Sequence, residues 1–299
     1  LRYVRTDGSI GSNPVWQTDS AWGTTIVVNL STNTIYYFKV KAKNGDGVET
    51  AFGPVASKYT RAAVPTNPYI DSVTTNTVTI GWDANGNPNY TDYTVEYYHD
   101  FPSLPPLQDN WTTAFSTTGP TSGTHTGLKS NTTHFYRIRA FNEEGLPTGY
   151  TTTISTLTYA AVPPVATLTV AGPTEISIDV NYGNNHHDTA LRVIVDTTTN
   201  ALSFDTTGYL QSDGTVSSYP DVWFKDADWG TKLVVGLTPN SMYRFKVQAV
   251  NFTRTQESEF GPEAWKYTYA NPPTGTSITA VYPSSITIQW SANNNPVGT

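Results

Sequence analysis

The densest set of side chains that could bind a metal ion is His186, His187 and Asp188. Imidazole nitrogens and a carboxylate oxygen are zinc ligands, and these three lie in a predicted loop with Asn184 and Asn185. Adjacent side chains on extended backbone point to opposite faces, so they rarely bind one ion together. We therefore expect a solvated loop here, and no metal site.

Two acidic residues, Asp226 and Asp228, flank Ala227 and could face the same way. A calcium site needs about six oxygen donors, and the sequence shows only two here. The sequence contains no GxSxG nucleophile turn, HExxH zinc helix, phosphate-binding glycine loop or EF-hand loop. We therefore predict no catalytic residue, no cofactor and no metal.

Three tryptophans, Trp22, Trp111 and Trp229, are candidates for a surface that stacks on sugar rings or on a neighbouring protein. Trp22 and Trp229 each precede a glycine at matched positions of the chain. The alternative is that they close the edge of a core, because tryptophan is usually mostly buried.

Composition limits the possible partners and the fold class. The net charge is −7, and the 17 lysines and arginines form no cluster, which argues against nucleic acid and anionic membranes as partners. No apolar stretch is long enough for membrane insertion, and the absence of cysteine excludes disulfides and thiolate metal sites. Abundant threonine and tyrosine favour strands, so the composition predicts an all-β protein.

One strand pattern occurs three times, in residues 30–44, 128–142 and 237–251. Each copy begins with a leucine, continues with alternating apolar and polar residues, and closes with Ala-x-Asn. Period-two alternation places one set of side chains in a core and the other in solvent. The residue six positions after each leucine completes the pattern: Leu30 with Tyr36, Leu128 with His134, and Leu237 with Tyr243.

This pattern resembles the fibronectin type III domain, in a tandem extracellular array of bacterial type. The resemblance implies seven-stranded antiparallel β-sandwiches, with Leu30, Leu128, Leu237, Tyr36 and Tyr243 in the structural core. It also implies a tyrosine corner, in which the tyrosine hydroxyl bonds to nearby backbone. His134 replaces the tyrosine in the middle copy, so we expect that corner to be the weakest.

The repeat divides the chain into four parts. Residues 1–62 are the C-terminal part of a domain, 63–161 and 162–270 are complete domains, and 271–299 are the first two strands of a further domain. Proline-containing linkers join the parts, and proline restricts both its own backbone and that of the preceding residue. We therefore expect a semi-rigid array.

A second recurring strand places a tryptophan in the core. Val78, Ile80 and Trp82 alternate, and Ile286, Ile288 and Trp290 repeat them. Trp82 and Trp290 are therefore predicted core residues. In residues 162–270 the matched position is Val180, so the missing volume must be filled from elsewhere.

Residues 271–299 and 1–62 are predicted to be complementary, with Thr299 of one copy meeting Leu1 of the next. In this alignment Leu1 takes the place of Asp92, at the start of a strand. The proline junctions give domain lengths of 98, 109 and, for the joined pieces, 92 residues. The chain begins with leucine and not methionine, so we expect processing or excision from a longer chain.

These observations predict a non-catalytic structural repeat unit of an extracellular or cell-surface filament, sheath or surface layer. The partner is a further copy of the chain, reached either as a consecutive part of one long chain or by strand donation. A simply truncated piece of a tandem array is a third possibility. The alternative function is an adhesion, carbohydrate-binding or spacer module, with carbohydrate or glycans as partner.

Overall fold

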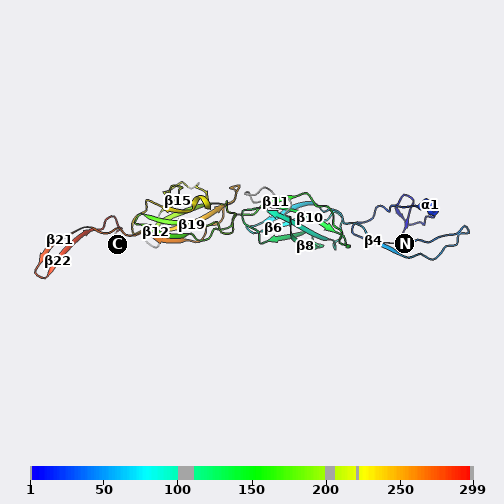
Figure 1. Cartoon of the computed structure of the whole chain (residues 1–299), viewed down its shortest axis with the longest axis horizontal. Coiled ribbons are helices and arrows are strands. Elements are labelled where there is room, and N and C mark those ends of the chain that lie inside the picture. The colour runs from blue at the N-terminus through cyan, green and yellow to red at the C-terminus, as the bar shows by residue number, and fades with distance from the viewer. Residues whose placement is uncertain (1, 100–110, 199–205, 220–221, 297–299) are drawn as a thin grey trace. The chain divides into compact units, whose positions relative to one another are not determined.

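The computed structural model describes residues 2–99, 111–198, 206–219 and 222–296 (Figure 1). Residues 1–62 contain β1 (Tyr3–Val4), β2 (Ile10–Gly11), α1 (Asp19–Trp22), β3 (Ile35–Phe38) and β4 (Ala56–Tyr59). Residues 63–161 contain β5 (Thr66–Val73), β6 (Thr77–Asp83), β7 (Asp92–His99), β8 (Thr112–Thr118), β9 (Ser122–Thr126), β10 (Thr133–Phe141) and β11 (Ile154–Leu157).

Residues 162–270 contain β12 (Thr167–Gly172), β13 (Glu175–Asp179), β14 (Ala190–Thr198), β15 (Thr206–Leu210), β16 (Val216–Ser217), β17 (Phe224–Lys225), α2 (Asp226–Trp229), β18 (Thr231–Val234), β19 (Met242–Val250) and β20 (Ala264–Tyr267). Residues 271–299 contain β21 (Thr274–Tyr282) and β22 (Ser285–Ser291). The all-β prediction is confirmed. Among the described residues each helix has four residues, and neither is long or apolar enough to cross a membrane.

The strands of residues 63–161 form two antiparallel sheets. One sheet has the order β5-β6-β9 and the other β11-β10-β7-β8. The predicted seven strands are confirmed for this domain. Alternation along β10 gives five half-buried side chains separated by four buried ones, as expected for a strand with one face on the core.

The strands of residues 162–270 repeat this plan with additions. The sheet β12-β13-β18 faces a larger sheet in the order β16-β15-β14-β19-β20, in which β17 also pairs with β14. Strand β15 pairs with β14 as β8 pairs with β7, so the additions are β16 and β17, and this domain has nine strands and not the predicted seven.

The tyrosine corners form where the sequence places them. The Tyr36 hydroxyl accepts a hydrogen bond from the Ser31 amide at 2.8 Å, and the Tyr243 hydroxyl accepts one from the Thr238 amide at 2.7 Å. In the middle copy, His134 is buried at the matched position. Leu128 and Leu237 are buried, whereas Leu30 is half-buried.

Tryptophans occupy different positions in the cores of the two complete domains. Trp82 is buried and contacts Tyr93, with ring centres 5.4 Å apart. In residues 162–270, Val180 stands at the matched position and Trp229 joins the core cluster instead. The indole of Trp229 reaches this core from α2, and its ring centre lies 5.2 Å from that of Phe224. Trp229 thus supplies volume that the Trp-to-Val difference removes.

Candidate functional site

The structure brings His186, His187 and Asp188 together, with one possible ligand atom from each lying within 4.8 Å of the others. The Asp188 carboxylate pairs with the Lys225 ammonium at 2.9 Å, and the hydrogen bond from Lys225 lowers the pKa of Asp188. The Nδ1 atom of His186 accepts a hydrogen bond from the Asp188 amide at 3.2 Å. A cation at this loop would therefore compete with a lysine for the only carboxylate of the cluster.

Asp226 and Asp228 lie in the first turn of α2. Residues two apart on a helix do not face each other, so the expectation that their carboxylates could point the same way is wrong. Burial raises the pKa of Asp226, and the nearby charge of Asp179 raises it further. These carboxylates do not form an oxygen-rich cation site.

The three candidate surface tryptophans differ in exposure. Trp229 is only 2% exposed and its indole N–H donates to the Leu191 carbonyl at 3.0 Å, so the surface-binding prediction is wrong for this residue. Its position in α2 places it in the core cluster that also contains Val180. Trp22 and Trp111 are half-buried.

Trp111 belongs to a stack of rings and cations on the outer face of β7 and β10. The Arg137 guanidinium lies between two rings, 4.2 Å from the centre of Trp111 and 3.8 Å from that of Tyr150. Tyr98 meets Trp111 edge-on at 4.7 Å and stacks on Phe135 at 4.5 Å. Because Arg137 already covers the Trp111 ring, this geometry disfavours a sugar-stacking platform.

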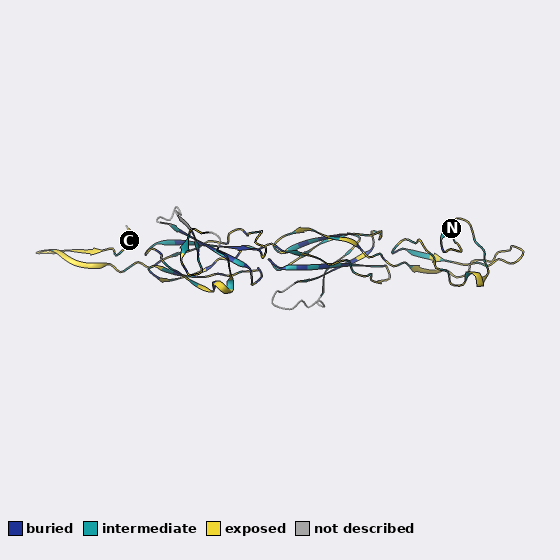
Figure 2. Ribbon diagram, turned by 90° about the horizontal axis from the view of Figure 1, so that it is seen from above, coloured by how far each residue is buried: buried dark blue, intermediate teal, exposed yellow. Residues whose placement is uncertain are grey.

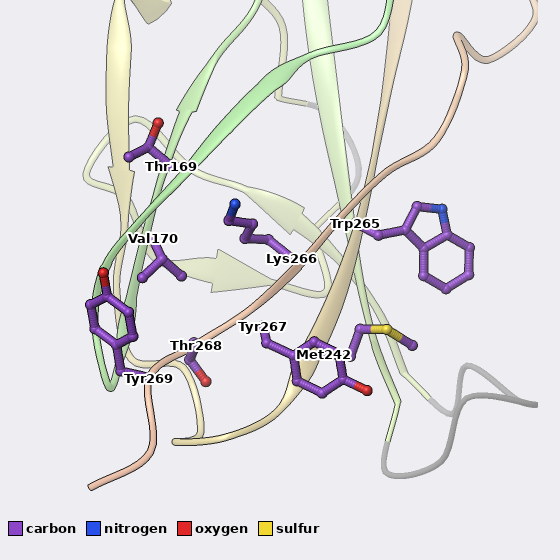
Figure 3. Close-up of a pocket in the computed structure, with 8 residues that line it drawn as sticks. All are labelled: Thr169, Val170, Met242, Trp265, Lys266, Tyr267, Thr268 and Tyr269. Carbon is purple, nitrogen blue, oxygen red and sulfur yellow. The ribbon is translucent and has the colours of Figure 1, made fainter.

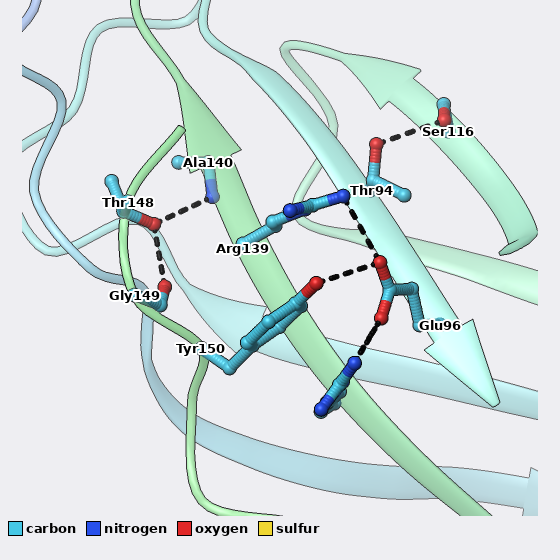
Figure 4. A network of polar contacts seen from close by, with 9 residues as sticks. Thr94, Glu96, Ser116, Arg139, Ala140, Thr148, Gly149 and Tyr150 are labelled. Atoms are coloured by element: carbon cyan, nitrogen blue, oxygen red, sulfur yellow. Dashed lines mark hydrogen bonds and ion pairs between the residues drawn. The ribbon is translucent and has the colours of Figure 1, made fainter. Parts of the chain in front are cut away.

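A buried carboxylate anchors the same face (Figure 4). Glu96 accepts hydrogen bonds from Arg137 at 2.7 Å and from the Tyr150 hydroxyl at 2.8 Å, and it pairs with Arg139 at 3.1 Å. In the other complete domain, Asp196 pairs with Arg244 at 2.6 Å. Both oxygens of Glu96 are engaged by donors, the arginines of β10 and the Tyr150 hydroxyl in the segment before β11, so the network is structural.

The Glu96 network predicts acid sensitivity of residues 63–161. Burial tends to raise the Glu96 pKa, but the Arg137 and Tyr150 hydrogen bonds and the arginine charges lower it overall. A carboxyl whose folded pKa lies below its unfolded value stabilises the fold above the unfolded value, about 4.3, and this stabilisation is lost as the pH falls through the folded pKa.

We therefore expect the stability of this domain to fall on acidification below about pH 4.5, and Glu96→Gln to flatten that dependence. Urea unfolding from pH 3 to 7, followed by amide exchange in β10, measures it. Glu259→Gln, an exposed carboxylate of the other domain, is the control. Equal pH slopes for Glu96→Gln and the parent would contradict the prediction.

A groove of about 620 Å³ lies on residues 162–270, lined by β12, β19, β20 and the two residues that follow β20 (Figure 3). Its polar groups are the Lys266 amine, tyrosine hydroxyls and threonine hydroxyls. The eight lining residues include no histidine and no carboxylate.

The two partial domains, residues 1–62 and 271–299, expose apolar side chains whose counterparts are buried, and β21 and β22 are exposed along nearly their whole length (Figure 2). Trp290 on β22 is 61% exposed, whereas Trp82 at the matched position is 2% exposed. Ile286 and Ile288 are exposed too, and their counterparts Val78 and Ile80 are fully buried. Trp290 is therefore not a core residue in this chain, because the opposite sheet is lacking.

Residues 1–62 also expose apolar side chains whose counterparts in residues 162–270 are buried. Val40 is 78% exposed, and Val247, which is 207 positions later, is 1% exposed. Strand β3 ends at Phe38, whereas its counterpart β19 continues to Val250. The counterpart β19 pairs along its length with β14, and no strand of residues 2–62 takes that place on β3.

The predicted join between Thr299 and Leu1 is in the wrong register. Strands β1 and β2 pair Tyr3 with Gly11, and β15 and β16 pair Tyr209 with Ser217 in the same arrangement. The turns also match: Asp7 caps Ser9 as Asp213 caps Thr215. Residues 1–11 therefore repeat β15–β16 and not the start of β7, as the sequence alignment had placed them.

In this register, one stretch of residues 162–270 has no counterpart in residues 271–299 or in residues 1–62. Asn295 matches Asn185, because each side-chain oxygen accepts a hydrogen bond from the backbone amide of the linker residue 24 positions before it. By this spacing residue 299 corresponds to 189 and residue 1 to 207, so positions 190–206 have no counterpart. These are 17 positions. Thr299 and Leu1 themselves lie outside the described residues.

The missing segment contains the counterpart of β14, which lies between β15 and β19. Residues 271–299 and 1–62 thus contain no counterpart of this strand. The pair supplies counterparts of β12, β13, β15, β16, β19 and β20, and lacks the strand that joins two of them.

No family model matches the chain, and no curated protein matches it. A two-domain fibronectin type III segment of chicken tenascin aligns with a TM-score of 0.43 and 16% identity, covering 68% of this chain and 99% of that one. The FN1–FN3 domains of chicken CNTN1 align with a TM-score of 0.37 and 19% identity, covering 76% and 74%. Both complete domains are fibronectin type III-like sandwiches. This assignment rests on the strand order of both domains and on the tyrosine corner of residues 162–270, as described above.

Proposed function

We propose that this chain is a non-catalytic structural unit of an extracellular filament, sheath or surface layer. In the assembly, residues 271–299 of one copy and 1–62 of the next belong to one sandwich. The observation that carries the proposal is the contrast between matched positions: Trp290 and Val40 are exposed, whereas Trp82 and Val247 are buried. Contiguous exposed apolar faces often mark interaction sites in proteins.

The complementarity of the two faces supports a copy of the chain as the partner. Residues 271–299 contain the counterparts of β12 and β13, two strands of one sheet. Residues 1–62 contain the counterparts of β15, β16, β19 and β20, which form most of the facing sheet. An interface that uses different surfaces of the two copies extends into a filament unless its rotation closes a ring.

The completed sandwich requires one further strand in the place of β14. Two routes supply it. In one, the units are consecutive parts of a longer chain, joined by about 17 residues that include the strand. In the other, the strand is donated by a separate chain, as in β-augmentation. A native polypeptide mass far above 32.7 kDa favours the first route, and a mass near that value favours the second.

A fusion of two full copies tests the proposal. In one version, residues 190–206 are inserted between Thr299 of the first copy and Leu1 of the second; in the control the copies are joined directly. We expect the insert to protect β22 of the first copy from amide exchange, because the missing strand completes the facing sheet and so lets the sandwich close over β22. Isotope labelling of one copy distinguishes their peptides by mass.

Trp290→Ala in the first copy provides a second measurement. We expect it to destabilise the completed domain by about 3–5 kcal/mol, as for a buried tryptophan, and to have little effect in the single chain. If β22 stays unprotected and Trp290→Ala remains without effect in the fusion with the insert, the proposed completion is wrong.

A further inference from the structure

A buried asparagine bridges residues 1–62 to the following domain. Asn33 has a left-handed backbone with φ 43°, and its side chain is fully enclosed. Its amide nitrogen donates to the Thr91 hydroxyl at 2.9 Å, and its amide oxygen accepts from the Glu143 amide at 2.9 Å. Both partners belong to the following domain, so one side chain fixes two of its loops.

The same arrangement occurs at the next junction. Asn131 has φ 49° and is fully buried. It donates to the Thr189 hydroxyl at 2.8 Å and accepts from the Phe252 amide at 3.0 Å. We call this arrangement the asparagine clasp. Asparagine suits it because it tolerates left-handed backbone better than most residues.

The third position in the series is Asn240, with φ 46°. Its backbone amide donates to the Tyr269 carbonyl at 3.0 Å, as Asn131 donates to Tyr159 at 3.1 Å. The adjoining linker also has the hydrogen bond seen at the other junction: the Asn295 side chain accepts from the Asn271 amide at 2.7 Å, as Asn185 accepts from Ala161. The acceptor side of a third clasp is therefore built.

The donors Glu143 and Phe252 each follow an asparagine at the end of a strand. In residues 1–62 the matching pair is Asn44 and Gly45. The Asn44 side chain accepts from the amides of Asp46 and Val48, as Asn142 does from those of Glu144 and Leu146. The turn that presents Glu143 to Asn33 is thus already formed around Gly45.

The Gly45 amide is exposed and has no acceptor among the described residues. We propose that it donates to the Asn240 side chain of the preceding copy and so closes the third clasp between two copies. This inference rests on the proposed function. An ion pair accompanies it: Lys58 meets Glu144 at 2.8 Å at the first junction, and the matched residues are Lys266 of one copy and Asp46 of the next.

The clasp adds specificity to the assembly. A single hydrogen bond contributes modestly to affinity, but its donor and acceptor must meet in one geometry. The apolar faces alone would tolerate a slipped arrangement, whereas the clasp forms only when the following domain is complete and in register.

The fusion with the inserted strand tests the inference. Asn240→Gly in the first copy removes the acceptor and keeps a residue that adopts positive φ without strain. We expect the Gly45 peptide of the second copy to exchange its amide roughly three- to tenfold faster. The same substitution in the second copy, where no Gly45 follows, is the matched control and should leave that rate unchanged.

Gly45 offers a second pair of variants in the second copy. Proline at position 45 removes the donor and fits the turn, whose Gly47 amide bonds to the Asn44 carbonyl at 3.1 Å, because proline is favoured at the second position of such turns. Alanine keeps the donor, and a Cβ there meets no atom within 4 Å. We expect Gly45→Pro, but not Gly45→Ala, to speed amide exchange in β22 of the first copy.

The outcomes separate the two proposals. If β22 of the first copy is protected but Asn240→Gly gives the same Gly45 exchange in either copy, the clasp is wrong and the completed sandwich stands. If β22 is unprotected in the fusion with the insert, both proposals are overturned.

Discussion

Replacing Trp82 by alanine should destabilise residues 63–161 by about 3–5 kcal/mol. The side chain is 2% exposed and contacts Tyr93, so its removal leaves a cavity in a packed core. Among the described residues its indole N–H has no acceptor, so the cost arises from packing. Urea unfolding of the full chain measures the loss, with amide exchange in β6 assigning the transition.

The matched control is Val180→Ala in the other complete domain. Val180 stands at the same position but has fewer atoms to lose, so we expect a cost of about 1.5–2.5 kcal/mol. An unchanged unfolding midpoint for Trp82→Ala would show that this tryptophan does not support the core.

Trp229→Ala should be as costly for residues 162–270, about 3–5 kcal/mol, because Trp229 fills the core that Val180 leaves open. Here a hydrogen bond is lost as well, since the indole N–H donates to the Leu191 carbonyl. Denaturation of the full chain, read from exchange in β19, measures this change.

Two phenylalanine variants separate packing from hydrogen bonding. Trp229→Phe leaves the buried Leu191 carbonyl without its indole donor and should cost about 1–3 kcal/mol more than its volume change alone. Trp82→Phe removes no such bond. Trp22→Ala, at the half-buried counterpart in residues 1–62, should have a smaller effect than Trp229→Ala. Equal effects at Trp22 and Trp229 would contradict the assignment of Trp229 to the core.

The fold could be predicted because its determinants are local. Alternation along residues 237–251 and the Leu237–Tyr243 pair indicate which face of the strand packs on the core. The tyrosine corners at Tyr36 and Tyr243 both form. The seven strands of residues 63–161 follow from the same alternation and from turn residues between strands.

The register of the partial domains could not be predicted in the same way. Leu1 to Val4 alternate much like the start of β7, and both segments are short, so apolar pattern alone fits either strand. The turn that caps Ser9 through Asp7 distinguishes them, because it repeats the turn at Asp213 and Thr215. That signal is a pair of polar residues, which a search for core positions overlooks.

The roles of the candidate site residues were harder to predict from the sequence than the fold. Trp22 and Trp229 carry the same sequence signal, a tryptophan before glycine, but Trp229 is buried in a complete core and Trp22 is half-buried in a partial domain. The asparagine clasps were also missed. Asn33, Asn131 and Asn240 are spaced regularly within the repeat, and that spacing could have found them.

Hairpin β21–β22 has a consequence for handling the protein. Residues 271–299 contain no Asp, Glu, Lys, Arg or His, and one edge and one apolar face of the hairpin lie open. Charged residues flanking such strands normally keep them from pairing with other chains, and here there are none. Solubility of the isolated chain should therefore be set by this hairpin and fall steeply with concentration. A lysine placed on the outward face, at Thr287 or Gln289, should raise it.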